Sequence, residues 1–170
     1  AYAETDSAIK SNYRFEEPFV VPEPAKAIVS RIESPAVFAS SCYVWNFMLN
    51  MKLCRMIKAQ NPNCLTIAGG PHIPDDIEEF LGKYPEVDLW VHGEGEVPFH
   101  DILKENLKDN PDFSSITGVS SAKGKNVSIN PLNPKEQLPR QLFEEQLPSP
   151  YLLGYFDELI PKLKKHNPEM

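Results

Sequence analysis

The sequence lacks the features that would tie it to a nucleic acid, to a membrane or to secretion. Its 17 Lys and Arg residues are outnumbered by 24 Asp and Glu residues, which gives a net charge of −7, and no Lys/Arg cluster precedes Lys162. This balance argues against a basic surface for nucleic acids or anionic lipids. No apolar run approaches the roughly 18 to 20 residues of a membrane span, and no basic-then-apolar signal opens the chain. We therefore expect a cytoplasmic protein with no nucleic-acid partner and no membrane partner.

Cysteine is also scarce, and the arrangement of the cysteines that occur excludes two kinds of site. Cys42, Cys54 and Cys64 form neither an even set for disulfides nor a Cys-x-x-Cys pair for a metal. We therefore expect three reduced cysteines in the core. Three histidines fall on different loops or inside a helix without a dense set of carboxylates, so they predict no metal site either. These histidines are His72, His92 and His100.

Two phosphate-binding signatures are missing. The segment Gly93-Glu94-Gly95-Glu96 is rich in glycine, but it is acidic and carries no Lys and no Ser or Thr. It therefore does not match the Gly-x-x-x-x-Gly-Lys-Ser/Thr loop that cradles phosphates. The pattern Gly-x-Gly-x-x-Gly is absent as well, so neither a dinucleotide nor a nucleoside triphosphate is the expected ligand.

What the sequence does contain is an alternation of apolar strands with amphipathic helices, on a chain long enough for one domain and an appendage. The expected strands are 36–40, 65–68 and 87–92, and the expected helices are 22–32, 45–60, 75–83 and 98–108. Short connections between alternating elements predict an α/β fold with a doubly wound, mostly parallel sheet. Two more strands, 116–121 and 126–129, flank Lys123-Gly124-Lys125 and predict an antiparallel hairpin at the edge.

The two ends of the chain are less regular. Residues 1–10 contain no complete element and look like the tail of a helix whose beginning is missing, and 13–21 predicts only a weak strand, interrupted by Pro18. Proline is enriched after Asn130, which predicts a proline-rich extension, followed by a short helix within 151–163. We expect a domain over residues 1–130 and a linker with a short helix over residues 131–170.

The loops at the carboxyl ends of parallel strands form one rim, where such sheets bind ligands. Loops 40–46, 69–72 and 93–96 are therefore expected to converge. Gly69-Gly70 would let a ligand lie against bare backbone, although a glycine pair also suits a tight turn without a ligand. His72 follows this pair after Pro71 and is expected to face the ligand.

The other rim residues each have two interpretations. Tyr43 and Trp45 offer the aromatic surface that a large flat ligand with a polar edge requires, or they are core or helix-packing residues. Ser41 either contacts the ligand or caps a helix. Glu94 and Glu96 form an acid/base pair, or they cap the helix that follows them.

Several phrases, in this order, resemble a known family. Ser41-Cys42-Tyr43 and, after 25 intervening residues, Gly69-Gly70 are similar to the Ser-x-Leu and Gly-Gly parts of the cobalamin-binding Rossmann-like domain. Longer phrases resemble the amino-terminal domain of cobalamin-dependent radical SAM enzymes and its connector to the radical SAM barrel. These phrases are Tyr43-Val44-Trp45-Asn46, Ala68-Gly69-Gly70-Pro71-His72, His92-Gly93-Glu94-Gly95-Glu96-Val97-Pro98-Phe99 and Ser149-Pro150-Tyr151-Leu152-Leu153-Gly154-Tyr155-Phe156-Asp157.

The resemblance implies a flavodoxin-like sheet with the nucleotide tail of cobalamin along its strand ends. Ser41 would then approach the dimethylbenzimidazole. The walls of the tail slot would be Tyr43, Gly69 and Gly70. The residues beside the corrin would be Trp45, Asn46, Gly93, Glu94, Gly95 and Glu96, and the remaining cofactor-binding residues would be Pro71 and His72. The resemblance implies no catalytic residue in this chain.

Two family phrases do not occur. Without Asp-x-His-x-x-Gly, the sequence offers no matched lower ligand for cobalt, so no residue is assigned to the metal. Without Cys-x-x-x-Cys-x-x-Cys, the iron-sulfur cluster and S-adenosylmethionine would belong to a domain that this sequence does not include. Together with the missing opening strand, this leads us to expect an excised cofactor-binding domain.

Three hypotheses about function follow. The first is a cobalamin-binding domain that binds without turnover and that has a radical SAM domain in cis, in a parent enzyme that transfers methyl groups. The second is a Rossmann-like domain for another small ligand, with Glu94, Glu96 and His72 as acid/base groups. The third is a protein-docking module whose segment 151–163 packs on a partner.

Overall fold

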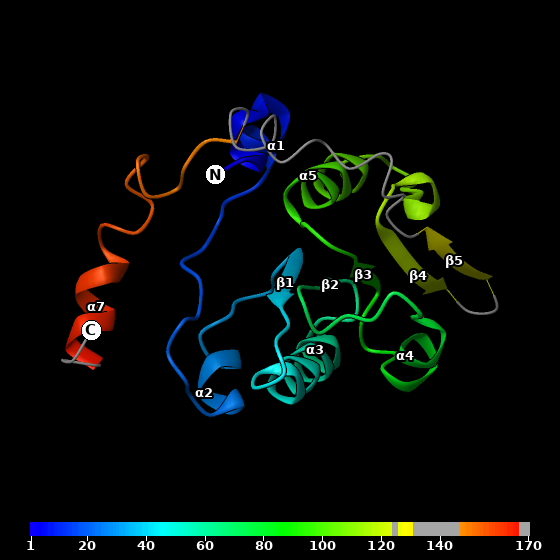
Figure 1. Ribbon diagram of the computed structural model, residues 1–170, viewed down its shortest axis with the longest axis horizontal. Coiled ribbons are helices and arrows are strands. Elements are labelled where there is room, and N and C mark those ends of the chain that lie inside the picture. Colours follow the sequence, from blue (N-terminus) through cyan, green and yellow to red (C-terminus); the bar gives the residue numbers. More distant parts are fainter. Residues whose placement is uncertain (124–125, 131–146, 167–170) are drawn as a thin grey trace.

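The computed structural model describes residues 1–123, 126–130 and 147–166. Its centre is a sheet with the strand order β1-β2-β3-β4-β5 (Figure 1). The first three strands are parallel, and β4 and β5 continue the sheet in antiparallel pairing. The strands are β1 (Val37–Ser41), β2 (Leu65–Gly69), β3 (Leu89–Val91), β4 (Val119–Lys123) and β5 (Asn126–Asn130). The α/β class and the antiparallel edge hairpin predicted from the sequence are thus confirmed; the tip of that hairpin lies outside the described residues.

Helices cover both faces of the sheet. Figure 1 shows α5 (Glu96–Glu105) on one side, with α3 (Phe47–Gln60) and α4 (Glu78–Lys83) on the other. The order of the described strands runs in one direction, without the reversal that a complete doubly wound sheet contains. The helix α5 begins two residues before the predicted start, which leaves Pro98 in its first turn, where no backbone N–H is needed.

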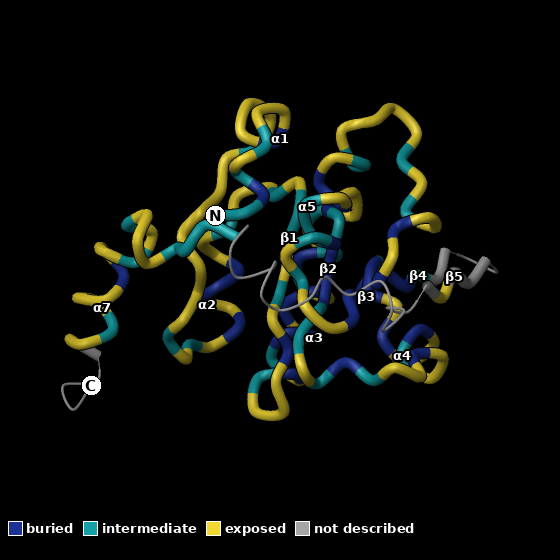
Figure 2. Tube along the Cα trace, turned by 45° about the horizontal axis from the view of Figure 1, so that its top comes forward, coloured by how far each residue is buried: buried dark blue, intermediate teal, exposed yellow. Residues whose placement is uncertain are grey.

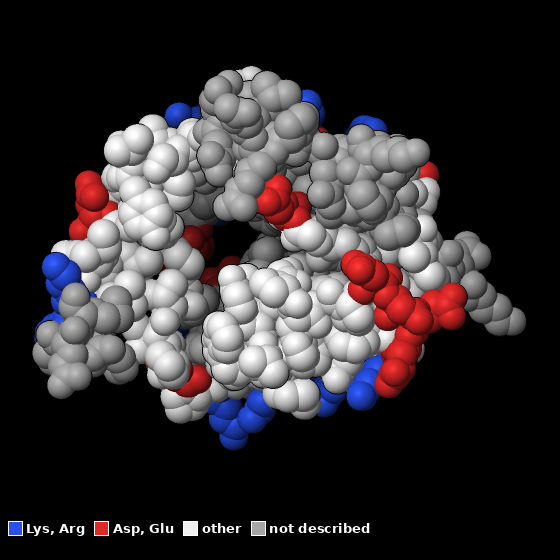
Figure 3. All heavy atoms as spheres, in the orientation of Figure 1, with Lys and Arg blue, Asp and Glu red and all other residues white. Residues whose placement is uncertain are grey.

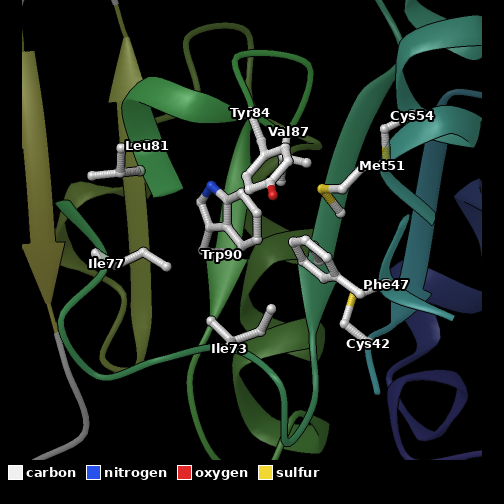
Figure 4. Close-up of a cluster of buried hydrophobic side chains, with 11 residues drawn as sticks. Cys42, Phe47, Met51, Cys54, Ile73, Ile77, Leu81, Tyr84, Val87 and Trp90 are labelled. Atoms are coloured by element: carbon white, nitrogen blue, oxygen red, sulfur yellow. The ribbon is translucent and has the colours of Figure 1, made fainter. Parts of the chain in front are cut away.

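The core lies in two layers, because alternate residues of β3 point to opposite faces. Leu89 and Val91 pack with Ile102 of α5. Trp90, which is fully buried, points the other way into the cluster under α3 and α4 (Figure 4). Burial of a large apolar side chain contributes about 1.5 to 3 kcal/mol, so the contacts of β3 fix both layers. Figure 2 shows that burial concentrates on these central elements.

The amino-terminal segment packs on the outside of this core. The short helices η1 (Ala3–Thr5) and α1 (Ser7–Asn12) lie against α5, with Ile9 fully buried. The prediction that residues 1–10 hold no complete element is therefore wrong. The weak strand predicted at 13–21 is wrong too: this segment has no ladder partner, and Pro18 lacks the backbone N–H that a ladder needs.

Two further helices are shorter or later than predicted. The helix α2 (Ala25–Val29) packs on α3 within the range predicted for it, 22–32. A 3-10 turn, η2 (Phe113–Ser115), precedes β4. The carboxyl-terminal helix α7 covers Leu159–His166, whereas the preceding residues form turns. The proline-rich stretch predicted after Asn130 falls mostly outside the described residues.

The segment that carries α7 stands apart from the sheet in Figure 1. Lys162 of α7 forms an ion pair with Glu17, with 2.6 Å between Lys162 Nζ and Glu17 Oε2, so the segment lies beside the amino-terminal segment. Within the part of the chain that the structure describes, no helix is both long and apolar enough to span a bilayer.

Candidate functional site

The carboxyl ends of the three parallel strands form one edge of the sheet. In the strand register, Ser41 lies beside Gly69, and Gly69 lies beside Val91. The loops that follow β1, β2 and β3 therefore start next to one another, as the sequence predicts. This edge carries the residues that the sequence singles out for a ligand.

The first two loops are locked together by a close contact between Gly70 and Cys42. Gly70 has φ +108°, and a Cβ placed on it would lie 2.8 Å from the carbonyl oxygen of Cys42 and 2.9 Å from its nitrogen. Real side chains do not tolerate either distance. The backbone N–H of Cys42 donates to Gly69 O at 2.6 Å, and that of His72 donates to Cys42 O at 3.1 Å. Gly70 thus admits the protein's own backbone, rather than leaving bare backbone for a ligand as the sequence predicts.

Two amides hold the loop after β1 in shape. Asn46 Nδ2 and Asn50 Nδ2 both donate to the carbonyl oxygen of Ser41, at 3.0 and 3.1 Å. The side-chain oxygen of Asn46 also accepts from the backbone N–H of Tyr43 at 2.7 Å. Sequence reasoning missed Asn50, although a signal existed: this amide lies on the apolar face of α3 and is buried. Ser41 is not the cap of α3, since that helix begins after Asn46.

Tyr43 and Trp45 form a stacked pair on the surface. Their ring centroids are 4.7 Å apart, and the ring planes differ by 16°. Tyr43 is 37% exposed and Trp45 is 77% exposed, so the interpretation of these two rings as core residues is wrong. Val44 and Met48 beside them are also exposed. Four exposed large apolar side chains within six residues make a surface that suits a bound ligand or partner.

His72 and Pro71 close the loop after β2. The imidazole of His72 is half-buried, with its ring centroid 4.7 Å from that of Phe47 at the start of α3. Pro71 is exposed. His72 thus packs on one side and has solvent on the other.

The loop after β3 leaves two free carboxylates. Gly93 takes a positive φ of 65°, and Gly95 precedes α5 with open space where a Cβ would point. Glu94 and Glu96 are exposed, and neither side chain has a hydrogen-bond or ion-pair partner among the described residues. No side-chain cap is formed at the start of α5, so the interpretation of these two glutamates as hydrogen-bonding caps is wrong.

His92, the residue before Gly93, is buried and only 3% exposed. Its Nε2 lies 2.9 Å from the hydroxyl of Ser120, while its Nδ1 has no hydrogen-bond partner. Burial lowers the pKa of His92, and the charge of Asp75 opposes this shift. The imidazole is therefore neutral at neutral pH. No role was predicted for His92 from the sequence.

A model described as the B12 binding domain matches residues 17–103, which is more than half of the chain. The chain belongs to the B12-binding domain family. The matched range contains α3, the three parallel strands and the rim loops between 40 and 96, so the family match and the candidate site coincide.

Two curated relatives match almost the whole chain. The chain is 40% identical over 166 residues to 2-(S-pantetheinyl)-carbapenam-3-carboxylate methyltransferase of Streptantibioticus cattleyicolor. This alignment covers 98% of the chain and 24% of that relative. The chain is 43% identical over 159 residues to the cobalamin-dependent radical SAM methyltransferase TokK of Streptomyces tokunonensis. This alignment covers 94% of the chain and 23% of TokK. This B12-binding domain spans about a quarter of the length of these relatives. The predicted kinship with cobalamin-dependent radical SAM methyltransferases is confirmed.

The residues at the rim fit cobalamin. An exposed aromatic stack suits a large flat ring system, and a buried unpartnered imidazole suits a ligand that brings polar groups. The described residues contain no group of three or more His, Cys, Asp or Glu side chains placed to hold a metal ion. Cobalt is part of the cofactor itself, so such a group is not needed.

Other features of the B12-binding domain lie away from the rim or are inert. A cavity of about 250 Å³ near Pro35 and Asn61 lies at the amino ends of β1 and β2, the opposite edge of the sheet. The three cysteines are free and buried, and burial raises the pKa of Cys54 to about 12 and that of Cys64 to about 11. These thiols are unreactive at neutral pH.

Proposed function

We propose that this domain holds cobalamin across the carboxyl ends of β1, β2 and β3, as the cofactor-binding part of a radical SAM methyltransferase. The observation that carries the proposal is the stacked pair of Tyr43 and Trp45, exposed beside a rim that hydrogen bonds make rigid. Rigid placement lowers the entropy cost of binding a large ligand. The bound cofactor supplies a cobalt centre that can carry a methyl group.

The proposed contacts divide into two sets. The nucleotide tail lies near Ser41, Tyr43, Gly69 and Gly70, in a sheet that we propose to be flavodoxin-like. The corrin lies beside Trp45, Asn46, Pro71, His72, Gly93, Glu94, Gly95 and Glu96. The backbone of Cys42 occupies the space where a side chain of Gly70 would lie. We therefore propose that Gly70 joins the loops after β1 and β2, which both line the slot for the tail.

We propose that this chain binds cobalamin and performs no chemistry alone, with S-adenosylmethionine and the iron-sulfur cluster held by another domain of the parent. Among the described residues, neither the exposed carboxylate of Glu94 nor that of Glu96 has a partner that would hold it in place for an acid/base role. Free, buried cysteines are consistent with a cytoplasmic location.

The direct test mixes the purified chain with hydroxocobalamin, removes unbound cofactor by gel filtration and records the visible spectrum. Corrin absorbance that elutes with the protein in about equimolar amount is the expected result. The matched control is a double variant, Tyr43→Ser with Trp45→Ser, which changes only exposed side chains and is expected to retain less cofactor. A chain that elutes without corrin absorbance contradicts the proposal.

One observation favours a docking role in addition. Leu152 is 90% exposed, and Tyr151, Leu153 and Tyr155 beside it are exposed as well. Such a segment gains free energy when a partner covers it. We propose that the radical SAM domain of the parent covers it in cis. In a full-length protein with this domain, Leu152→Ser with Leu153→Ser is expected to reduce methyl transfer and leave cobalamin content unchanged; unchanged transfer would remove this role.

A further inference from the structure

His92 lies at the junction of β3 and β4. It directly follows β3, and its backbone N–H donates to Gly118 O at 2.9 Å, just before β4. Its side chain reaches Ser120, which is fully buried within β4. The hydrogen bond to Ser120 therefore orients the imidazole, and the backbone bond to Gly118 ties the residue to the start of β4. It belongs to the rim and also to the core.

The unpartnered Nδ1 of this imidazole is an exception in the described structure. Among the buried side-chain nitrogen and oxygen atoms of the described residues, only Nδ1 of His92 and Nε1 of Trp90 lack a hydrogen-bond partner. Leaving a buried polar atom unpaired is unfavourable, and each such atom in a folded protein calls for an explanation. For Trp90, the cluster around it is apolar on all sides. For His92, the neighbouring site offers an explanation.

That neighbouring site is the proposed slot for the nucleotide tail. Gly69 pairs with Val91 in the strand register, so Gly70 and His92 are the next residues on adjacent strands. Ile73 and Ile77 pack on Trp90 from the loop after β2 (Figure 4), and Asp75 of the same loop acts on His92 through its charge. His92 therefore begins the loop next to the glycine turn, and its imidazole reaches toward β4.

We propose that Nδ1 of His92 forms a hydrogen bond with a polar group of the nucleotide tail of cobalamin and thereby positions that tail. This inference rests on the proposed function. Nδ1 is buried, so the tail reaches it only when neighbouring residues shift. Asp75 and Asp76 in the loop before α4 are exposed, and Figure 3 shows acidic side chains gathered on the surface near α4.

The contact with Ser120 lets His92 serve either kind of partner. A neutral imidazole has one N–H donor and one bare acceptor nitrogen, and a serine hydroxyl can both donate and accept. If Ser120 donates to Nε2, Nδ1 carries the proton and can donate to a phosphate oxygen. If Ser120 accepts from Nε2, Nδ1 can accept from a ribose hydroxyl. The pair adapts without a change of charge.

The test compares two substitutions that each keep one of the two ring nitrogens. The amide of asparagine reaches the position of Nδ1, and that of glutamine reaches the position of Nε2. His92→Gln is expected to raise the Kd for hydroxocobalamin about 3- to 10-fold, the net effect of one hydrogen bond, and His92→Asn by less. His100→Gln on α5 is the matched control, with an unchanged Kd. Circular dichroism confirms that each variant folds.

A second arm uses cobinamide, which has the corrin but not the nucleotide tail. The Kd for cobinamide is expected to be the same for the unchanged chain and for His92→Gln. Equal weakening toward both ligands would place the partner on the corrin and overturn the assignment to the tail. An unchanged Kd for hydroxocobalamin in His92→Gln would overturn it as well.

A third readout needs no substitution. With ¹⁵N-labelled histidine in the unchanged chain, the Nδ1 resonance of His92 is expected to move on addition of hydroxocobalamin and to stay in place on addition of cobinamide. An Nδ1 resonance that does not move with hydroxocobalamin overturns the inference while the proposed function stands. Failure of the unchanged chain to bind hydroxocobalamin at all overturns both.

Discussion

Gly70 and Cys42 approach so closely that only the absence of a side chain on Gly70 makes the contact possible. A Cβ at this position would lie 2.8 Å from Cys42 O, at a backbone φ of +108°. The contact joins the loop after β1 to the loop after β2, and both loops carry proposed cofactor contacts. The glycine that a binding motif requires is here required first by the fold.

Replacing Gly70 by alanine is therefore expected to destabilise the chain. Both the backbone strain and the overlap with Cys42 oppose a methyl group, at a cost of roughly 1 to 3 kcal/mol in the free energy of unfolding. Gly82→Ala is the matched control, because Gly82 lies in α4 with nothing within 4 Å of its missing Cβ. That change should be neutral or stabilise by roughly 0.5 to 1 kcal/mol. Urea denaturation of both variants measures the difference, and equal midpoints would contradict the contact.

The aromatic stack is expected to affect binding and not folding. Trp45 is 77% exposed, so Trp45→Ala should change the free energy of unfolding by less than about 0.5 kcal/mol. If the indole lies against the corrin, its loss should raise the Kd for hydroxocobalamin by roughly 2- to 10-fold, the worth of one aromatic contact. Leu152→Ala, which removes another exposed apolar side chain far along the chain, is the control for unspecific effects. A Kd that is the same in both variants would remove Trp45 from the site.

The sequence predicts the sheet well because its signals are local. The buried strands are short apolar runs, and the helices between them show the apolar period that packing on a sheet requires. The rim follows from the parallel pairing alone. Even the hairpin at 119–130 is visible as two strands around a glycine turn. These features depend on neighbouring residues and not on distant ones.

The rest depends on contacts between distant residues, which no local pattern contains. The reason for Gly70 lies 28 residues earlier, in Cys42, and the partner of His92 lies 28 residues later, in Ser120. The exposure of Tyr43 and Trp45 depends on where α3 begins. Residues 13–21 show the same from the other side: they include strand-forming residues, but no strand of the described structure lies beside them to pair with, so no strand forms.

Acid is expected to destabilise the fold through His92. Burial lowers the pKa of His92 below its ordinary value of 6.5, so well above pH 6.5 the residue is neutral in both the folded and the unfolded chain. As the pH falls below 6.5, the unfolded chain takes up a proton that the folded chain does not, and stability is lost. His92→Asn should make the urea midpoint less dependent on pH between 7 and 5. In His100→Gln, the part of this pH dependence that comes from His92 should remain. The same pH profile in His92→Asn and in the unchanged chain would contradict this.

Substitutions of Thr66 are expected to lower the stability of the fold and to leave cofactor binding unchanged. Thr66 is fully buried at the amino end of β2; its hydroxyl lies 2.8 Å from both Glu86 O and Asp88 Oδ2, and it accepts from the backbone N–H of Asp88 at 3.1 Å. Lys58 pairs with the same carboxylate at 2.5 Å. Valine has the shape of threonine but lacks the hydroxyl, which leaves Glu86 O without this buried donor, so Thr66→Val should cost about 2 kcal/mol.

Serine is the matched control for this site, because Thr66→Ser keeps the hydroxyl and loses only a methyl group, at a cost of about 0.8 kcal/mol. Both variants change the amino edge of the sheet, opposite to the rim, so the Kd for hydroxocobalamin should be unchanged in each under conditions where the chain is folded. Urea denaturation and cofactor titration together test this. A weaker affinity in Thr66→Val at full folding would show that the two edges of the sheet are coupled, and would move part of the binding free energy away from the rim residues.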